Sequence, residues 1–65
     1  MFIEVETRKK ETVSINISHI LFITPNKDGC VIFDITGYDY EVKESYEAVM
    51  ERINALLTVE YPQFD

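Results

Sequence analysis

The chain has 65 residues, 46% of them hydrophobic, and its 12 acidic and 6 basic side chains give a formal net charge of −6. This length holds one domain, and a single cysteine with a single histidine excludes an internal disulfide and a structural zinc site. The acidic balance disfavours nucleic acid and anionic membranes as partners, and no apolar run reaches the roughly 18 residues of a transmembrane helix.

The first part of the chain predicts short strands, because apolar and polar residues alternate with a period of two. Residues 2–7 and 12–15 form two such runs, joined by a charged turn. Residues 16–19 break the alternation with polar side chains that can bond their own backbone, so we expect a turn or a single helical turn there. A dense apolar strand follows at residues 20–24, and we expect it to stop at Pro25.

Two more strands are predicted at residues 30–35 and 38–43. Residues 26–29 form a clear turn before the first of them, since Asp-Gly tolerates the positive φ that tight turns need. Thr36 and Gly37 are interpreted as a two-residue connection between the two strands. The chain therefore predicts about five antiparallel strands in sequence.

A two-residue connection fixes which residues face each other across these last two strands. The expected facing pairs, all on one face of the sheet, are Ile35 with Tyr38, Phe33 with Tyr40, and Val31 with Val42. By the same alternation, the preceding strand adds Phe22 and Thr24 to that face. We expect this face to be the core.

The opposite face of the predicted sheet is mixed and supplies the candidate partner-binding surface. It would hold an apolar patch bordered by acids: Leu21, Ile23 and Ile32 with Asp34, Asp39 and Glu41. We expect the patch to bind a protein or a second copy, because so small a domain gains stability by burying more apolar surface. A charge at Ile32 would then abolish association and leave the fold intact. The alternative is a solvated surface that resists aggregation.

An amphipathic helix is predicted after Ser45, a favourable N-cap residue. Its apolar residues recur at spacings of three and four: Tyr46, Val49, Met50, Ile53, Leu56 and Leu57. We expect the helix to fade near Thr58, which gives one sheet-plus-helix domain at residues 1–58 and a C-terminal tail at 59–65. The predicted fold class is α+β: a small twisted antiparallel β-meander of about five strands, able to curl toward a barrel. One C-terminal helix would cover its Val31, Phe33 and Tyr40 face.

The titratable residues do not form a pattern for catalysis or for a cofactor. His19 lies in a predicted turn with no nucleophile placed beside it by sequence, and Cys30 has only Lys27 near it to activate a thiol. Asp28 lies in an Asp-Gly turn that lacks the alternating ligands of a calcium loop. We therefore expect a protein that is not an enzyme and that uses no cofactor and no metal.

A set of apolar spacings and turn residues runs through about two-thirds of the chain. It comprises Val13-Ser14-Ile15-Asn16, Ile20, Ile23, Pro25 through Gly29, Val31, Phe33, Gly37, Glu41 through Ser45, and Glu47-Ala48-Val49. This set resembles the FlbD family, small bacterial proteins linked to flagellar function and swarming motility. The order of strands, turn and helix is also similar to part of the LytTR type of DNA-binding domain.

Together these observations predict a small, FlbD-like interaction or regulatory module that works through protein–protein contacts and forms a homo-oligomer. Two alternatives stay open. Arg8, Lys9 and Lys10 could contact DNA in a regulator related to LytTR-type domains, or the acidic surface could mimic nucleic-acid charge and block a DNA-binding protein. The start of the chain lacks the pattern of a signal peptide, so we expect a cytoplasmic location and no membrane partner.

Overall fold

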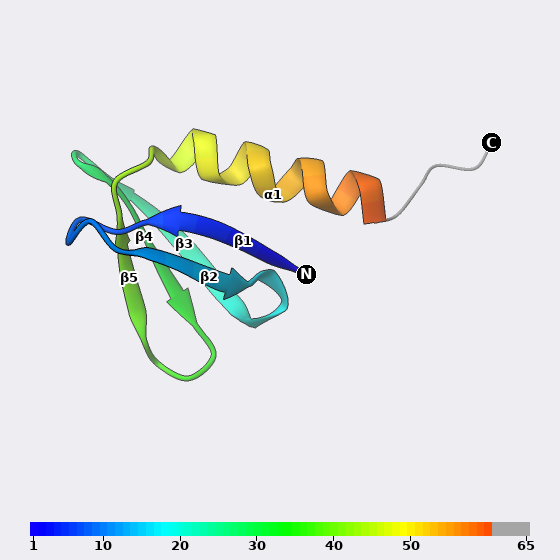
Figure 1. Ribbon diagram of the computed structural model, residues 1–65, viewed down its shortest axis with the longest axis horizontal. Coiled ribbons are helices and arrows are strands. Elements are labelled where there is room, and N and C mark those ends of the chain that lie inside the picture. Colours follow the sequence, from blue (N-terminus) through cyan, green and yellow to red (C-terminus); the bar gives the residue numbers. More distant parts are fainter. Residues whose placement is uncertain (61–65) are drawn as a thin grey trace.

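The computed structural model of the protein describes residues 1–60, which form antiparallel strands followed by one α-helix (Figure 1). The elements are β1 (Phe2–Glu6), β2 (Thr12–Asn16), the 3₁₀-helix η1 (Ile17–His19), β3 (Ile20–Asn26), β4 (Gly29–Asp34), β5 (Asp39–Val42) and α1 (Tyr46–Glu60). The predicted α+β class, with five antiparallel strands in total and a C-terminal helix, is confirmed.

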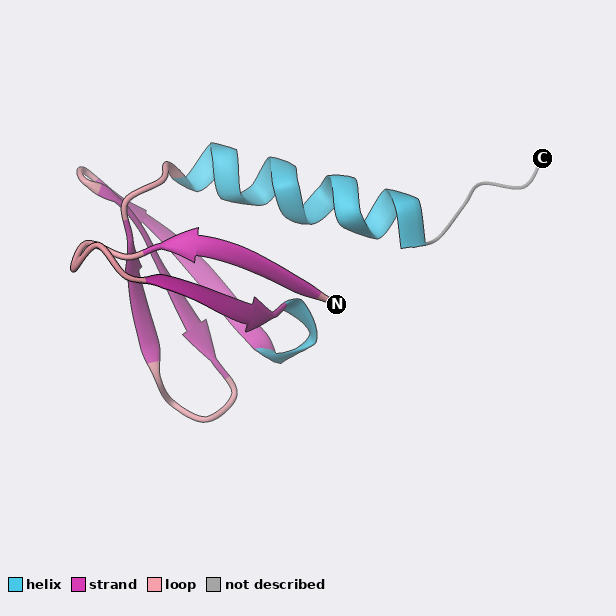
Figure 2. Ribbon diagram, in the orientation of Figure 1, coloured by secondary structure: helices cyan, strands magenta, loops and turns pink. Residues whose placement is uncertain are grey.

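The strands form two antiparallel units, the hairpin β1–β2 and the three-stranded sheet β3–β4–β5. A bridge between Thr7 and Val42 joins the hairpin to β5. Beside it the Arg8 amide donates to the Glu41 carbonyl over 2.9 Å, and the Lys43 amide donates to the Glu6 carbonyl over 3.0 Å. The hairpin crosses in front of the sheet and diverges from it, so the strands do not close into a barrel (Figure 2).

The core lies between the hairpin, the sheet and α1, and each of the three supplies apolar side chains to it. Its buried members are Ile3, Val5, Ile15, Cys30, Ile32, Val42, Val49 and Ile53. The alternation of β1, the inward side of β4 and the predicted stripe of α1 all converge on this cluster. Burial of these side chains is the main favourable contribution to folding, since the described residues contain no disulfide.

The register of β4 and β5 differs by one residue from the prediction. The observed pairs are Cys30 with Val42, Val31 with Glu41, Ile32 with Tyr40, and Phe33 with Asp39. The predicted pairing of Phe33 with Tyr40 was wrong. Because side chains alternate along a strand, a shift of one residue exchanges the two faces of β4 relative to β5. The core therefore contains Ile32, and the Phe33 side of the sheet is not the side that α1 covers.

The cause of this shift is the connection between the two strands. The Asp34 amide donates to the Tyr38 carbonyl over 3.0 Å, which pairs these two residues and leaves three residues, 35–37, in the loop rather than two. One carboxylate oxygen of Asp34 accepts hydrogen bonds from the amides of Thr36 (2.9 Å) and Tyr38 (3.2 Å) and from the Thr36 hydroxyl (2.6 Å). This carboxylate builds a longer turn than the sequence alone indicates.

Two element boundaries also differ from the prediction. β3 continues through Pro25 and does not stop before it, because β3 has a strand neighbour on one side only and the missing amide costs no ladder bond there. The predicted N-cap is confirmed, as the Ser45 hydroxyl accepts from the Ala48 amide over 3.1 Å. α1 extends to Glu60, two residues beyond Thr58, and the rest of the predicted tail lies outside the described residues. Over residues 1–60, α1 lacks the length and apolar content needed for a membrane crossing.

Candidate interaction surface

The six residues predicted to form a partner-binding patch do not share one surface. Ile32 is completely buried, Ile23 is partly buried against the core, and Asp34 is only 8% exposed. The prediction that Ile32 lies on an exposed face was therefore wrong. A charge there would disrupt the core rather than only block association.

The other three predicted residues are exposed. Leu21 is 62% exposed, at the point where the β3–β4 register shifts between Ile20 and Phe22. Asp39 and Glu41 lie on β5, opposite Phe33 and Val31. The structure thus brings the two acids next to the apolar residues that were predicted to be core.

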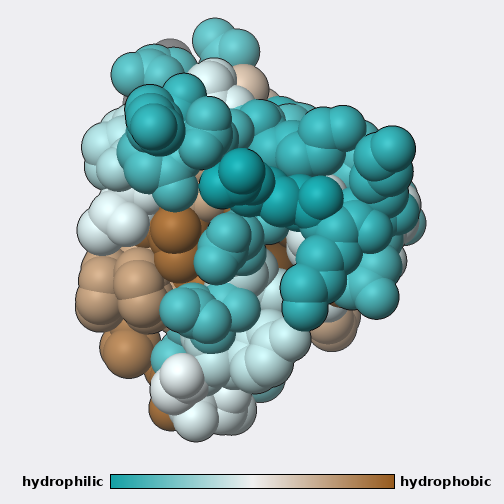
Figure 3. Space-filling view, turned by 90° about the vertical axis from the view of Figure 1, so that its left-hand side faces the viewer, coloured by the Kyte–Doolittle hydropathy of each residue, from teal (hydrophilic) through white to brown (hydrophobic). Residues whose placement is uncertain are grey.

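The exposed side of the three-stranded sheet carries its own apolar cluster. We call this side the outer face, and its residues are Phe22 and Thr24 of β3, Val31 and Phe33 of β4, and Asp39 and Glu41 of β5. The rings of Phe22 and Phe33 stack with their centroids 4.5 Å apart, although Phe22 is 52% exposed. Figure 3 shows apolar surface gathered along one side of the molecule and hydrophilic surface over the rest of that view.

The charged residues around the outer face form weak, exposed ion pairs. Arg8 lies 3.3 Å from Asp28 and 3.9 Å from Glu41, and the side chains of all three are about half exposed or more. Exposed pairs of this kind contribute between about 0 and 1 kcal/mol each. The Arg8 guanidinium therefore lies between two acidic side chains. Asp39 takes part in none of the ion pairs found among residues 1–60.

The buried titratable groups serve the fold. The hydrogen bond from the Thr36 hydroxyl is the largest of several that lower the pKa of Asp34 below its usual 3.8. Burial raises the pKa of Tyr40, whose hydroxyl donates to Asp34 over 3.2 Å. Burial, with a smaller contribution from Glu44, also raises the pKa of the Cys30 thiol. A buried thiol with a raised pKa stays protonated and unreactive near neutral pH.

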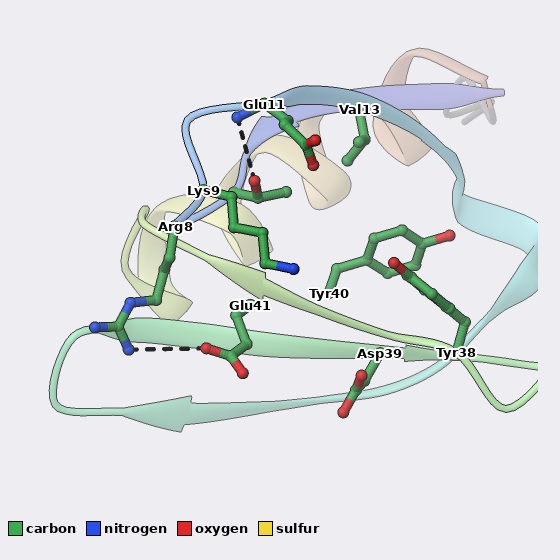
Figure 4. Close-up of a pocket in the computed structure, with 9 residues that line it drawn as sticks. Arg8, Lys9, Glu11, Val13, Tyr38, Asp39, Tyr40 and Glu41 are labelled. Carbon is green, nitrogen blue, oxygen red and sulfur yellow. Dashed lines mark hydrogen bonds and ion pairs between the residues drawn. The ribbon is translucent and has the colours of Figure 1, made fainter.

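A groove of about 250 Å³, which the sequence did not indicate, lies between the hairpin and β5 (Figure 4). Val13, Tyr38 and Tyr40 supply its apolar lining, and Lys9 and Glu11 reach into it from the hairpin. The two tyrosine rings meet edge to face, with centroids 4.7 Å apart. Within residues 1–60, no three His, Cys, Asp or Glu side chains gather in a way that could hold a metal ion.

Comparison with known proteins gives one family. The model of the family described as FlbD, flagellar and swarming motility proteins, matches residues 2–58. The matched segment includes the hairpin, the three-stranded sheet and most of α1. No curated protein and no solved structure matches the chain.

Proposed function

This chain belongs to the FlbD family of flagellar and swarming motility proteins, and we propose that it serves motility as a non-enzymatic module acting through protein–protein contacts. The observation that carries the proposal is the stacked pair of Phe22 and Phe33 on the outer face, of which Phe22 is half exposed and Phe33 is partly buried. Aromatic side chains are enriched in the buried centres of protein interfaces. The outer face is therefore the surface on which we expect the contact to form.

The energetics of the outer face support this proposal. Removing a Phe side chain from water contributes roughly 1.5–3 kcal/mol, and Phe22 still has half of its surface exposed. Val31 is only partly buried and extends the apolar surface along β4. A second protein that covers these side chains would gain free energy that the isolated domain leaves unused. Self-association through the same face is the simplest form of such a contact.

The charge distribution favours a protein over nucleic acid as the partner. Arg8, the first residue of the basic run considered for DNA contact, already pairs with Asp28 and Glu41. A phosphate group would have to displace these acids and would meet a chain of net charge −6. The proposal includes no catalytic role, because the Asp34 carboxylate is hydrogen-bonded within the turn and the Cys30 thiol is buried in the core.

The test is a charge substitution on the outer face, with a matched control elsewhere. We expect Phe22→Lys to abolish swarming when a gene encoding this variant replaces the native gene in a bacterium that carries this protein. Phe2→Lys is the control, because Phe2 is 61% exposed but lies on β1, away from the outer face. It should keep swarming close to the wild-type level.

Two measurements on the purified variants make the result interpretable. Thermal melts followed by circular dichroism should show that both variants fold. Light scattering over a dilution series should show whether wild-type protein forms oligomers that Phe22→Lys lacks. Wild-type swarming in a folded Phe22→Lys variant would remove the outer face from the proposal.

A further inference from the structure

One edge of β5 is only partly paired, and its hydrogen bonds show which groups are free. The Glu41 carbonyl accepts from Arg8, and the Lys43 amide donates to Glu6, so both groups point away from β4. The Tyr38 carbonyl instead accepts from Asp34 of β4. Backbone groups of successive residues point to opposite edges of a strand. Odd-numbered residues of β5 therefore direct their backbone groups to the edge away from β4.

The free groups on this edge belong to Asp39 and Glu41. The alternation directs the Glu41 amide, the Asp39 amide and the Asp39 carbonyl away from β4. No main-chain hydrogen bond outside the β-ladders of residues 1–60 reaches any of the three. An exposed edge with unpaired donors and acceptors is a template for one more strand.

The groove beside this edge has the size and lining for the side chain of a strand. Its volume of about 250 Å³ is below the roughly 300–1,000 Å³ of small-molecule sites. Tyr40 projects from β5 into it, and Val13 faces it from β2 (Figure 4). Lys9 also extends over the groove, which disfavours a second positive charge at this position.

The chain's own segment beside β5 shows which side chains this edge accepts. Thr7 faces Val42 and is buried, whereas its neighbours place opposite charges next to those of β5 on the exposed side. The Glu6 carboxylate lies 3.8 Å from the Lys43 ammonium, and the Arg8 guanidinium lies 3.9 Å from the Glu41 carboxylate. Cross-strand pairs of this kind stabilise a ladder. The next positions along β5 are Tyr40, facing the groove, and Asp39, facing outward.

We propose that an extended segment of a partner protein adds to β5 at Asp39–Glu41. It forms main-chain hydrogen bonds with the free edge, places an apolar residue in the groove against Tyr40, and places lysine or arginine beside Asp39. A second copy of β5 is a poor occupant, because its acidic side chains would lie beside those of the first. The free main-chain edge and the groove are distinct from the stacked phenylalanines on which the proposed function depends, although Asp39 also lies on the outer face, opposite Phe33.

The test is an NMR titration of ¹⁵N-labelled protein with a capped pentapeptide in which lysine and valine alternate, Lys-Val-Lys-Val-Lys. We expect saturable shifts of the Asp39 and Glu41 amide signals at millimolar peptide. Two control peptides have matched charge: one is methylated on its backbone amides, and one has the order Lys-Lys-Lys-Val-Val. Both should bind at least several-fold more weakly, because they lack the main-chain donors or the alternation.

Variants separate the edge from general charge attraction. Asp39→Lys should weaken binding about fivefold, since an attractive cross-strand pair becomes repulsive. Glu51→Lys changes the net charge equally on the exposed side of α1 and should leave the affinity unchanged. Phe22→Lys should also bind the peptide with wild-type affinity. A swarming result that removes the outer face from the proposed function would therefore leave the peptide result unchanged.

Three outcomes would overturn the inference. The first is equal binding of the methylated or reordered peptide, which indicates charge attraction alone. The second is a set of shifts confined to Phe22 and Phe33, which places the peptide on the outer face. The third is the absence of any shift at millimolar peptide.

Discussion

Both faces of the three-stranded sheet carry apolar side chains, but only on the inner face are some of them fully buried. On the inner face, Cys30 and Ile32 of β4 and Val42 of β5 are completely buried between the hairpin and α1. On the outer face, Phe22 and Phe33 stack against each other, and Phe22 remains half exposed. On β4 and its partner β3, the larger, aromatic residues are thus the ones left in contact with water. Hydrophobicity alone therefore does not identify the core of this domain.

The difference between the faces is set by covering elements and by one turn. β4 carries apolar side chains on both of its sides, so the hairpin and α1 could have covered either side. The three-residue connection made by Asp34 places Tyr40 and Val42 opposite Ile32 and Cys30. This gives β5 an apolar inner side and an acidic outer side. The outer face keeps its apolar side chains although the fold leaves them partly exposed, and the binding function proposed above depends on this exposure.

The largest expected effect compares truncation on the two faces. Ile32→Ala should lower the free energy of unfolding by about 2–5 kcal/mol, because it leaves a cavity in a fully buried site. Phe22→Ala should lower it by about 1 kcal/mol or less, since half of that side chain already meets water. Urea denaturation followed by circular dichroism measures both. Equal losses would show that the outer face is as important to the fold as the core.

A second comparison uses the two glycines, which both have positive φ. Gly29, at the start of β4, has φ of +149°, and an added Cβ would collide with the Val42 carbonyl. Gly37, in the loop before β5, has φ of +90° and open space around it. We expect Gly29→Ala to cost about 3 kcal/mol, from strain and displaced backbone, and Gly37→Ala about 1 kcal/mol, from strain alone.

The same denaturation measurement checks this pair. A Gly29→Ala variant as stable as Gly37→Ala would contradict the close packing of β4 against the backbone of β5. Because Gly29 lies at the end of the β3–β4 turn, its variant also reports how strictly that turn fixes the strand pairing.

The local features of the fold could be predicted from the sequence, and the choice of face could not. Alternation located the strands, and Ser45 marked the start of α1, because both signals depend on neighbouring residues. The β4–β5 register depends instead on how the Asp34 carboxylate folds the following loop. Thr36-Gly37 is also compatible with a tight two-residue turn. An error of one residue in the predicted loop length exchanged the two faces of β4. Ile32 was therefore predicted on the surface, although it lies in the core.

The candidate site was missed in part for the same reason. Asp39 and Glu41 were expected to border the patch of Leu21, Ile23 and Ile32, whereas the structure places them beside Phe33 and Val31. The groove and the free edge of β5 depend on where the hairpin leaves β5 after Arg8. That separation is a tertiary feature with no local sequence signal. A charged residue at every second position of β5 was the one available indication of an edge.

The smallest expected effect concerns Asp34, the residue that sets the two faces, and it appears as a pH dependence. Hydrogen bonds from Thr36, Tyr38 and Tyr40 lower the pKa of this carboxyl below its usual 3.8 in the native state. A lowered native pKa means that the unfolded state binds the proton more tightly, so ionised Asp34 stabilises the fold above pH 3.8. This contribution is lost as the pH falls from 3.8 through the native pKa. Tyr40 stays protonated over this range, because its own pKa is raised above 10.

We expect the melting temperature of Asp34→Asn to lie below that of the wild type by a constant amount at neutral pH. The difference should shrink below pH 4, because both proteins then carry an uncharged side chain at this position. The other carboxyl groups are common to the two proteins, so the difference between their melting temperatures at each pH isolates the contribution of the Asp34 charge. A difference that stays constant down to pH 2 would mean that the shape of the carboxyl group, and not its charge, holds the loop. The register that separates the inner from the outer face would then be independent of pH.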